Sequence, residues 1–323
     1  MSALLGVAGV LAQAADEATK SKGLGGFSLF LQRVFDGLDN GVIYAAIALS
    51  LVIIFKATTL INFAQGELAT LGTFMAYVFA VEQGLPVFLG IAVAMVLSAG
   101  AGALIERTLI RPFDPRNHLP IVIITLGLFQ IINAVAGKIW AYDPYRFPAP
   151  FPSKQGDLVQ IGQAQLKYTT IGRAATIAAV LVVLFLLLNK TKIGLAFRAV
   201  SSNLESSELV GIKVGSTLMF GWALASAIGT LGGSLVASNV LLEPNMMFRL
   251  LIFALAAAAL GGLDSPVGAV IGGLIVGWIQ SLVVGYVSFI GSELSLATAF
   301  VVILVVLLFK PAGLFGTARV ERV

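Results

Sequence analysis

The feature that most limits the fold of this chain is its series of long, uninterrupted apolar runs. Of its 323 residues, 58% are hydrophobic and only 11% are charged, whereas a soluble globular domain carries roughly 25% charged residues. In lipid, every backbone polar group must be bonded within the segment, so only helices and closed barrels can span a membrane. The runs are continuous and do not alternate with polar residues, which selects helices. The sequence therefore predicts an all-α, polytopic transmembrane helical bundle.

Nine apolar segments follow one another along the chain. They cover residues 38–55, 60–81, 87–105, 120–137, 169–188, 216–237, 248–262, 266–287 and 295–310. The segment at 248–262 is shorter than the roughly 20 residues that a full span needs, and glycines and Pro266 separate it from the next one. We expect these two segments to form a broken or re-entrant pair, which leaves about eight or nine membrane segments.

The two ends of the chain differ from the part between them. Residues 1–26 contain an apolar run, Leu4–Leu11, and then an A-x-A pattern that ends at Ala14, as in a cleavable signal peptide. The basic start of a signal peptide is missing, so an exposed N-terminal segment is the alternative. Residues 27–316 are the predicted transmembrane domain, and residues 317–323 are a predicted cytosolic tail.

An apolar helix face precedes the first long segment. It consists of Phe27, Phe30, Leu31, Val34 and Phe35, spaced as on one side of a helix. This spacing predicts an amphipathic helix that lies at the membrane surface.

Lysine and arginine are distributed unevenly between the connections. One set carries Lys56, Arg107, Arg111, Arg116, Lys190, Lys192, Arg198, Lys213, Lys310, Arg319 and Arg322. Basic connections usually face the cytosol, so we expect residues 190–213 and the C-terminus there, and the N-terminus outside. Arg173 and Arg249, at the outer ends of their segments, weaken this bias. Basic residues beside membrane spans usually set topology. The net charge of +4 is therefore explained without a nucleic-acid partner.

The long outer loop, residues 138–168, has two parts. Prolines fill the first part, and apolar residues then alternate with polar ones around Gly162. The alternation is typical of a small hairpin over the membrane. A simple linker is the equally open alternative.

One polar stretch with helical character, Lys190–Lys213, lies between two membrane-length apolar runs. Its apolar residues are interspersed with serines and glutamates. A short helix here would place one face in a groove on another protein, and Gly211 would end it through a left-handed cap. An ordinary solvated connector is the competing interpretation.

Three polar side chains stand near the start of the second apolar segment: Asn62, Gln65 and Glu67. Polar side chains inside a membrane normally face the bundle interior or a water-filled path, so these are candidates for lining the route of a polar solute. The structural alternatives are a bond from Asn62 to a neighbouring helix and an ion pair between Glu67 and Lys56.

A glycine-rich run, Leu260–Gly273, contains a further candidate. Pro266 suits the first turn of a helix, and Asp264 or Ser265 suits its N-cap. Interrupted helices are one pointer to a transport path, which makes Asp264 a candidate path residue. A capped, tightly packed helical hairpin is the simpler interpretation.

The sequence carries no pattern for catalysis or metal binding. It has no cysteine and a single histidine, His118, which excludes thiolate sites and histidine clusters. A glycine-rich phosphate-binding loop of the P-loop type is also missing. We therefore expect no cofactor, no metal and no catalytic residue, and no ATP hydrolysis by this chain itself.

Several motifs resemble those of the branched-chain amino acid ABC transporter permeases. They are Gly41–Phe55, Ile61–Glu67, Gly194–Val200, Leu209–Ile212, Gly261–Gly273 and Phe309–Gly316. Their common order across residues 34–316 makes the resemblance specific, although each motif alone is weak. Members of the family commonly have histidine where this chain has Gln65, which puts a titrating role there in doubt.

The resemblance implies a membrane subunit of a binding-protein-dependent importer in the bacterial plasma (inner) membrane. Its implied partners, besides the lipid bilayer, are a second related permease, two ATP-binding subunits and an extracytoplasmic solute-binding protein. The usual solutes are branched-chain amino acids, and relatives carry urea, amides or aromatic acids. The resemblance also implies an ATPase-coupling role for Gly194, Ala196, Arg198, Ala199, Glu205, Glu208, Leu209, Gly211 and Ile212.

Two other functions remain open on the residues alone. An ion-coupled secondary transporter would use Glu67 or Asp264 as its coupling carboxylate. A channel for a small neutral solute would need neither. Sensitivity of uptake to a protonophore favours the first, and passive flux through the purified chain favours the second.

Overall fold

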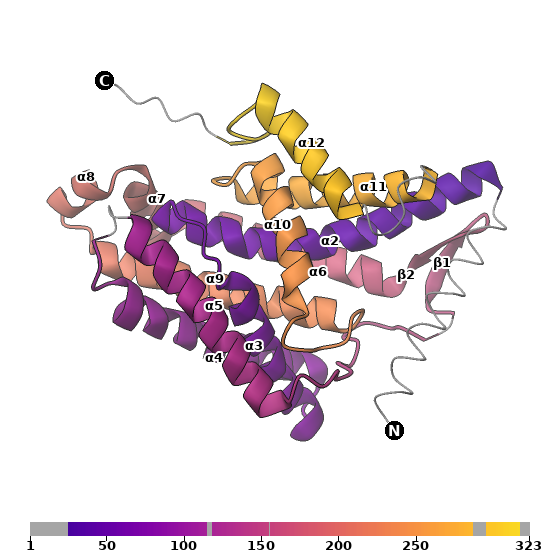
Figure 1. The fold of residues 1–323 in the computed structure, drawn as a ribbon, viewed down its shortest axis with the longest axis horizontal. Helices are drawn as coiled ribbons and strands as arrows, with labels where there is room; N and C mark the ends of the chain where they lie inside the picture. The colour runs from indigo at the N-terminus through magenta and orange to yellow at the C-terminus, as the bar shows by residue number, and fades with distance from the viewer. Residues whose placement is uncertain (1–24, 115–117, 155, 287–294, 317–323) are drawn as a thin grey trace.

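The computed structural model describes residues 25–114, 118–154, 156–286 and 295–316. The predicted N-terminal segment, apart from its last two residues, and the predicted tail at 317–323 lie outside the described residues. The described chain consists of helices and one small β-hairpin (Figure 1). The predicted helical class is therefore confirmed.

The helices divide into long and short ones. Six are long and apolar enough to cross a membrane by length and composition: α2 (Gly26–Thr58), α4 (Val87–Ile105, extended by a π-helical turn to Ile110), α5 (His118–Trp140), α6 (Tyr168–Lys190), α9 (Val214–Ala237) and α11 (Pro266–Tyr286). The shorter ones are α3 (Gln65–Tyr77, followed by a π-helical turn at Val78–Glu82), α7 (Lys192–Ser202), α8 (Leu204–Leu209), α10 (Met247–Gly261) and α12 (Ser295–Phe309). The count of eight or nine membrane segments stays a prediction.

Helix α2 is the central element of the bundle. Every residue from Gly41 to Ile54 is buried, and α2 contacts α9, α10 and α11. A helix covers the predicted apolar face at Phe27–Phe35, but it is the first part of one continuous helix that runs from Gly26 to Thr58. Its position at the membrane surface stays a prediction. No proline interrupts this stretch.

Helices α2 and α11 pack antiparallel through small residues. A Cβ atom on Gly277 would lie 2.3 Å from the backbone nitrogen of Gly41, and one on Gly273 would lie 2.5 Å from the backbone nitrogen of Ala45. Neither position has room for a side chain. Small residues let helix backbones approach closely in membranes, where lipid provides no hydrophobic drive for association. The close packing predicted from the glycine-rich run is thus present.

The short connection between α10 and α11 is a capped turn. Ser265 Oγ accepts a hydrogen bond from the backbone N–H of Gly268 at 3.0 Å. This bond satisfies one of the free N–H groups at the start of α11. Of the two predicted capping residues, Ser265 therefore fills the role by this bond.

The helical structure is also interrupted between α2 and α3, and this interruption lies inside the bundle. Thr59 ends α2 in a left-handed conformation, with φ of 58°. Gln65, the first residue of α3, donates its side-chain amide to the carbonyl of Ala225 at 3.0 Å. Ala225 lies near the middle of α9. Helix α3 therefore begins partway along a membrane-length helix and not at its end.

The loop that is predicted to lie outside, residues 138–168, contains a hairpin and not the simple linker that was the alternative. Strands β1 (Leu158–Ile161) and β2 (Ala164–Lys167) pair antiparallel, with Val159 opposite Leu166. Gly162 lies in the turn with φ of 63°, a conformation that glycine adopts at little cost. The backbone N–H of Gln165 donates to Gln32 Oε1 at 2.8 Å, which ties β2 to α2.

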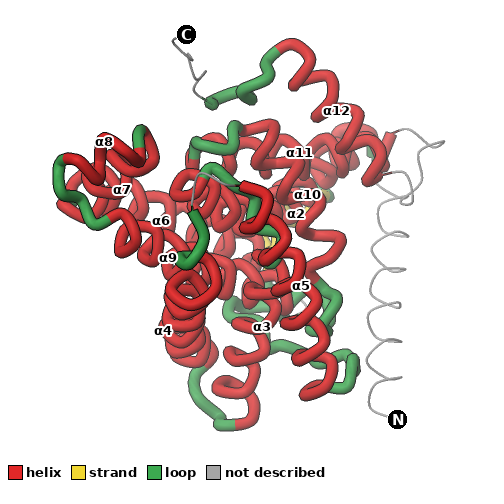
Figure 2. Tube along the Cα trace, turned by 60° about the vertical axis from the view of Figure 1, so that its left-hand side comes forward, coloured by secondary structure: helices red, strands yellow, loops and turns green. Residues whose placement is uncertain are grey.

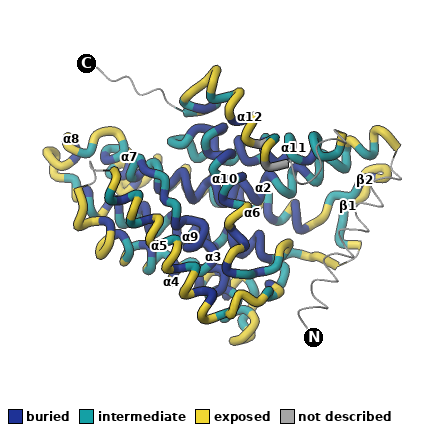
Figure 3. The backbone as a smooth tube through the Cα atoms, in the orientation of Figure 1, coloured by how far each residue is buried: buried dark blue, intermediate teal, exposed yellow. Residues whose placement is uncertain are grey.

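Helix α6 joins two ends of the molecule. It begins directly after β2, and one residue separates it from α7. Figure 1 shows the hairpin and the α7–α8 pair at opposite ends of the longest axis, and Figure 2 shows α7 and α8 projecting from the side of the bundle. Buried residues follow α2, α9 and α10, whereas α8 is largely exposed (Figure 3). The end of the longest axis that carries β1 and β2 is called below the hairpin end, and the opposite end is called the α7–α8 end.

Candidate functional site

Asn62 and Gln65 lie buried at the interruption between α2 and α3. Their exposed fractions are 2% and 0%. Asn62 Oδ1 accepts from the backbone N–H of Ala64 at 3.0 Å, and its amide nitrogen lies 3.4 Å from Gln65 Oε1. The bond to a neighbouring helix that was expected of Asn62 is made by Gln65, to α9. Together the two amides hold the interrupted backbone in place.

Glu67 is the centre of a second polar group. It is 1% exposed on α3. Asn133 of α5 donates its side-chain amide to Glu67 Oε2 at 3.3 Å and to Asn245 Oδ1 at 3.0 Å. The hydroxyl of Tyr142 donates to Asn133 Oδ1 at 3.0 Å. We call Glu67, Asn133, Tyr142 and Asn245 the Glu67 cluster.

The partners of Glu67 were not predicted. Asn133 stands inside the apolar segment 120–137, and a polar residue in such a segment is a signal that the sequence does carry. Its partners come from α3, from the residues after α5 and from the connection before α10. Only the tertiary structure brings these parts together.

Asp264 lies apart from the Glu67 cluster. Its backbone carbonyl accepts from Lys56 Nζ at 3.1 Å, so Lys56 contacts the α10–α11 connection. The predicted alternative of an ion pair between Glu67 and Lys56 is not formed. Asp264 lines a groove of about 1210 Å³ that Ser202 and Lys310 also line. The four predicted path residues are thus divided between the inside of the bundle and this groove.

Helix α7 is anchored on the bundle by one face. Thr191 caps it by accepting from the backbone N–H of Gly194 at 3.0 Å. Gly194, Phe197 and Val200 recur every three residues and are buried, which is the pattern of an amphipathic helix. A Cβ atom on Gly194 would lie 2.3 Å from a backbone oxygen of α6, and one on Gly221 of α9 would lie 3.0 Å from the Phe197 ring. Helix α7 therefore contacts both α6 and α9.

The surface of α8 is exposed and partly apolar. Leu209 and Val210 are 88% and 75% exposed, and Gly211 follows with φ of 82°, which confirms the predicted left-handed cap. An exposed apolar patch rimmed by polar residues marks an interaction surface. Of the predicted coupling residues, Gly194 is buried, Ala196, Ala199 and Ile212 are half-buried, and Arg198, Glu205, Glu208, Leu209 and Gly211 are exposed.

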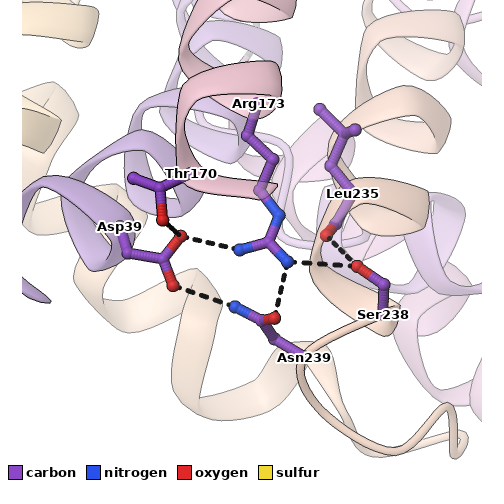
Figure 4. A network of polar contacts seen from close by, with 6 residues as sticks. All are labelled: Asp39, Thr170, Arg173, Leu235, Ser238 and Asn239. Atoms are coloured by element: carbon purple, nitrogen blue, oxygen red, sulfur yellow. Dashed lines mark hydrogen bonds and ion pairs between the residues drawn. The ribbon is translucent and has the colours of Figure 1, made fainter. Parts of the chain in front are cut away.

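A buried ion pair lies close to the hairpin end. Arg173 Nη1 contacts Asp39 Oδ1 at 2.7 Å, and the Arg173 side chain is 1% exposed. The other terminal nitrogen of Arg173 donates to Ser238 Oγ and Asn239 Oδ1. Thr170 and Asn239 both donate to Asp39. Figure 4 shows these side chains converging from α2, α6 and the end of α9. Arg173, one of the two arginines that weakened the charge bias, is thus neutralised within the protein.

The motifs from Gly41 to Gly273 and the helices α7 and α8 all lie within the region that one protein-family model matches. Residues 33–309 match the family model described as the permease component of the branched-chain amino acid transport system. The chain belongs to this permease family. It is accordingly a multi-pass membrane subunit of an ABC-type transport system, and the resemblance seen in the motifs is confirmed.

Individual relatives of this permease are similar over three quarters or more of its length. The high-affinity branched-chain amino acid transport system permease protein LivH of Escherichia coli is 29% identical over 92% of this chain and 99% of its own. The permease protein BraD of Pseudomonas aeruginosa is 26% identical over 91% of this chain and 98% of its own. The galactose/methyl galactoside import permease protein MglC of Escherichia coli is 24% identical over 77% of this chain and 85% of its own.

One solved structure is similar at a lower level. A chain of PsaBC from Streptococcus pneumoniae in complex with Fab is 14% identical and covers 89% of this permease and 94% of that chain, with a TM-score of 0.45. Within the described residues of the permease, no group of three or more His, Cys, Asp or Glu side chains is placed to hold a metal ion.

We predict that replacing Asn133 by alanine destabilises the permease by about 1–3 kcal/mol, because the buried carboxylate of Glu67 then loses a hydrogen-bond donor. Thermal unfolding of the purified protein in detergent measures the effect. The matched control is Asn189→Ala, which removes an exposed asparagine at the end of α6 and should change stability by less than about 0.5 kcal/mol. Equal unfolding temperatures for the two variants would contradict the prediction.

Proposed function

We propose that this permease is a membrane-spanning subunit of a binding-protein-dependent ABC importer in the bacterial inner membrane, and that its solute is a branched-chain amino acid or a related small polar molecule. The family match and the relatives named as branched-chain amino acid permeases support this function. Residues 27–316 form its permease domain. A second related permease, two ATP-binding subunits and an extracytoplasmic solute-binding protein complete the assembly, and ATP is hydrolysed on the ATP-binding subunits.

The main support for the proposal is that α7 and α8 lie between two membrane-length helices, α6 and α9. One residue separates α6 from α7, and four residues separate α8 from α9. Because Phe197 is buried and packs near Gly221 of α9, we expect a displacement of α8 to be transmitted through α7 to both α6 and α9. We assign the α7–α8 end to the cytosol, with the exposed residues Leu209 and Val210 facing an ATP-binding subunit.

ATP-driven closure of the partner subunits would then shift the permease between two conformations. A ligand shifts such an equilibrium only by its differential affinity for the two states. The difference in affinity arises if the α7–α8 pair docks more tightly on the ATP-binding subunits in their closed state than in their open state. Movement of α6 and α9 would alternate the access to a central path.

The solute path in this proposal passes the interruption between α2 and α3. Transporters commonly place their substrate sites at interrupted helices, where free backbone groups and polar side chains meet. Asn62, Gln65 and Glu67 lie there, and Asn133 adds a half-buried amide beside Glu67. Asp264 belongs to the groove at the α7–α8 end, which we place at the cytosolic exit.

Reconstitution of the complete complex in liposomes tests the function. We expect uptake of radiolabelled leucine to require ATP on the side of the α7–α8 pair and a binding protein on the other side, and to persist with a protonophore. Uptake that collapses with the protonophore while ATP stays high would favour ion-coupled transport. Passive flux through the purified chain alone would favour a channel.

A further inference from the structure

The groove at the α7–α8 end is formed where several helices begin or end. Its lining includes the last turn of α2, the first residue of α5, the start of α11 and the end of α12, together with the last residues of α7. Helices α2, α5 and α11 are each long and apolar enough to cross a membrane. The ends of such helices lie where the hydrocarbon core meets the polar headgroups. A groove lined by several of these ends therefore belongs at the level of the headgroups.

Two lysines in the groove are held by backbone carbonyls. Lys56 Nζ donates to the carbonyl of Asp264 at 3.1 Å, and Lys310 Nζ donates to the carbonyl of Leu314 at 2.7 Å. Within the described ranges of the chain, neither lysine forms a salt bridge. An ammonium group has three N–H donors. Each lysine is therefore fixed in place by a neutral acceptor and still has donors for an anion.

The two carbonyls that hold these lysines belong to segments that are bonded to each other. The backbone N–H of Leu314 donates to the carbonyl of Leu260 at 2.8 Å, and Leu260 lies four residues before Asp264. This bond joins the residues after α12 to the end of α10. Lys56 and Lys310 are thus positioned on one hydrogen-bonded junction and not on two independent loops.

Positive charge exceeds negative charge in the groove. Of the described residues that line it, the ionisable ones are Lys56, Lys310, His118 and Asp264. Asp264 is the one acid among them, and its carboxylate is attracted to Lys56. His118 and Ser202 add further hydrogen-bonding groups. Basic pockets between membrane helices attract anionic lipid headgroups, so the charge of this lining fits a phosphate.

Apolar side chains form the rest of the groove. Leu307, Phe309 and Phe315 line it, and Phe309 and its neighbour Leu308 are 82% and 79% exposed. A lining that is basic in one part and apolar in another matches an amphiphile better than a soluble anion. The volume of about 1210 Å³ exceeds the usual 300–1,000 Å³ of a small-molecule site. It therefore has room for a lipid headgroup and the first part of its acyl chains, beside a small solute near Asp264.

We propose that this groove binds an anionic phospholipid from the leaflet at the α7–α8 end, with Lys56 and Lys310 donating to its phosphate and its acyl chains against Leu308 and Phe309. The phosphate is joined to the glycerol by flexible bonds and has several acceptor oxygens, so it needs no fixed separation between the two lysines. The site depends neither on the solute of the permease nor on the direction of transport.

Native mass spectrometry of the complete complex, titrated in detergent with dioleoylphosphatidylglycerol, tests the proposal. We expect saturable binding of one such lipid per copy of this chain. Dioleoylphosphatidylcholine has the same acyl chains and a phosphate but no net charge, so it should bind about tenfold more weakly. Glycerol 3-phosphate, which has the charge but no acyl chains, should not displace the bound lipid at an equal concentration.

Variants of the two lysines separate a site from a general attraction of basic residues to anionic lipid. Lys56→Gln and Lys310→Gln should each weaken phosphatidylglycerol binding about fivefold, and the double variant roughly 25-fold. Lys56→Arg combined with Lys310→Arg keeps both charges and should retain the lipid. The matched control is Lys190→Gln combined with Lys192→Gln. It removes two exposed charges between α6 and α7 that do not line the groove, and it should leave the affinity unchanged.

Several results would overturn the proposal. An equal loss of lipid in the control pair would show attraction to the whole basic surface, and displacement by glycerol 3-phosphate would mark a site for a soluble phosphate. The absence of a retained lipid would show that a partner subunit covers the groove or that it stays empty. If the double glutamine variant does not fold, the arginine pair and the comparison of the two lipids on the unchanged complex still decide between these outcomes.

Discussion

Replacing Arg173 by alanine should destabilise the protein by about 3–5 kcal/mol, the usual cost of leaving one member of a buried ion pair without its partner. The Arg173 side chain is 1% exposed, and it bonds Asp39, Ser238 and Asn239 at once. Without it, Asp39 keeps only the neutral donors Thr170 and Asn239. The loss would appear as a lower unfolding temperature and a smaller yield of monodisperse protein in detergent.

A double variant separates the charge from the packing. Asp39→Asn combined with Arg173→Gln removes both charges while keeping hydrogen-bonding groups, so we expect it to recover about half or more of the lost stability. Lys154→Gln, an exposed charge in the outer loop, should cost less than about 0.5 kcal/mol. The interpretation fails if Arg173→Ala unfolds at the same temperature as Lys154→Gln, or if the double variant is no more stable than Arg173→Ala.

Replacing both Leu209 and Val210 by aspartate should abolish ATP-dependent uptake while leaving the permease folded. The two side chains are 88% and 75% exposed, so the folded chain gains little from them. In a docked complex they would be the apolar centre of the interface, and losing such a centre costs about 2 kcal/mol or more, or roughly 30-fold in affinity. Uptake by the reconstituted complex and co-purification of the ATP-binding subunits are the two measurements.

The control keeps the apolar surface and changes its shape. Leu209→Met combined with Val210→Ile should retain uptake and co-purification, because the buried apolar area at the interface is nearly the same. Unfolding temperatures of both double variants should match that of the unchanged protein. Normal uptake by the aspartate variant would show that the exposed pair does not dock an ATP-binding subunit.

Local patterns were enough to find most of the helices. The boundaries of α4, α6, α9 and α11 lie within a few residues of the predicted segments, because a long apolar run in lipid must bond its own backbone. The hairpin around Gly162, the cap at Ser265 and the left-handed Gly211 were also predicted from neighbouring residues. Each depends on spacing and turn chemistry over a few positions. The single long α2 was missed, since its continuity depends on packing against α11 as well as on local propensity.

The sequence by itself determined the class of the protein, the approximate bounds of most of its long helices apart from α2, and the family to which it belongs, because hydropathy and motif order are properties of the chain alone. The tertiary structure decided which polar residues meet. Asp39, Arg173 and Asn239 are far apart in sequence, and so are Glu67, Asn133 and Asn245. Partners at such separations are chosen by helix packing, and no local pattern records that choice.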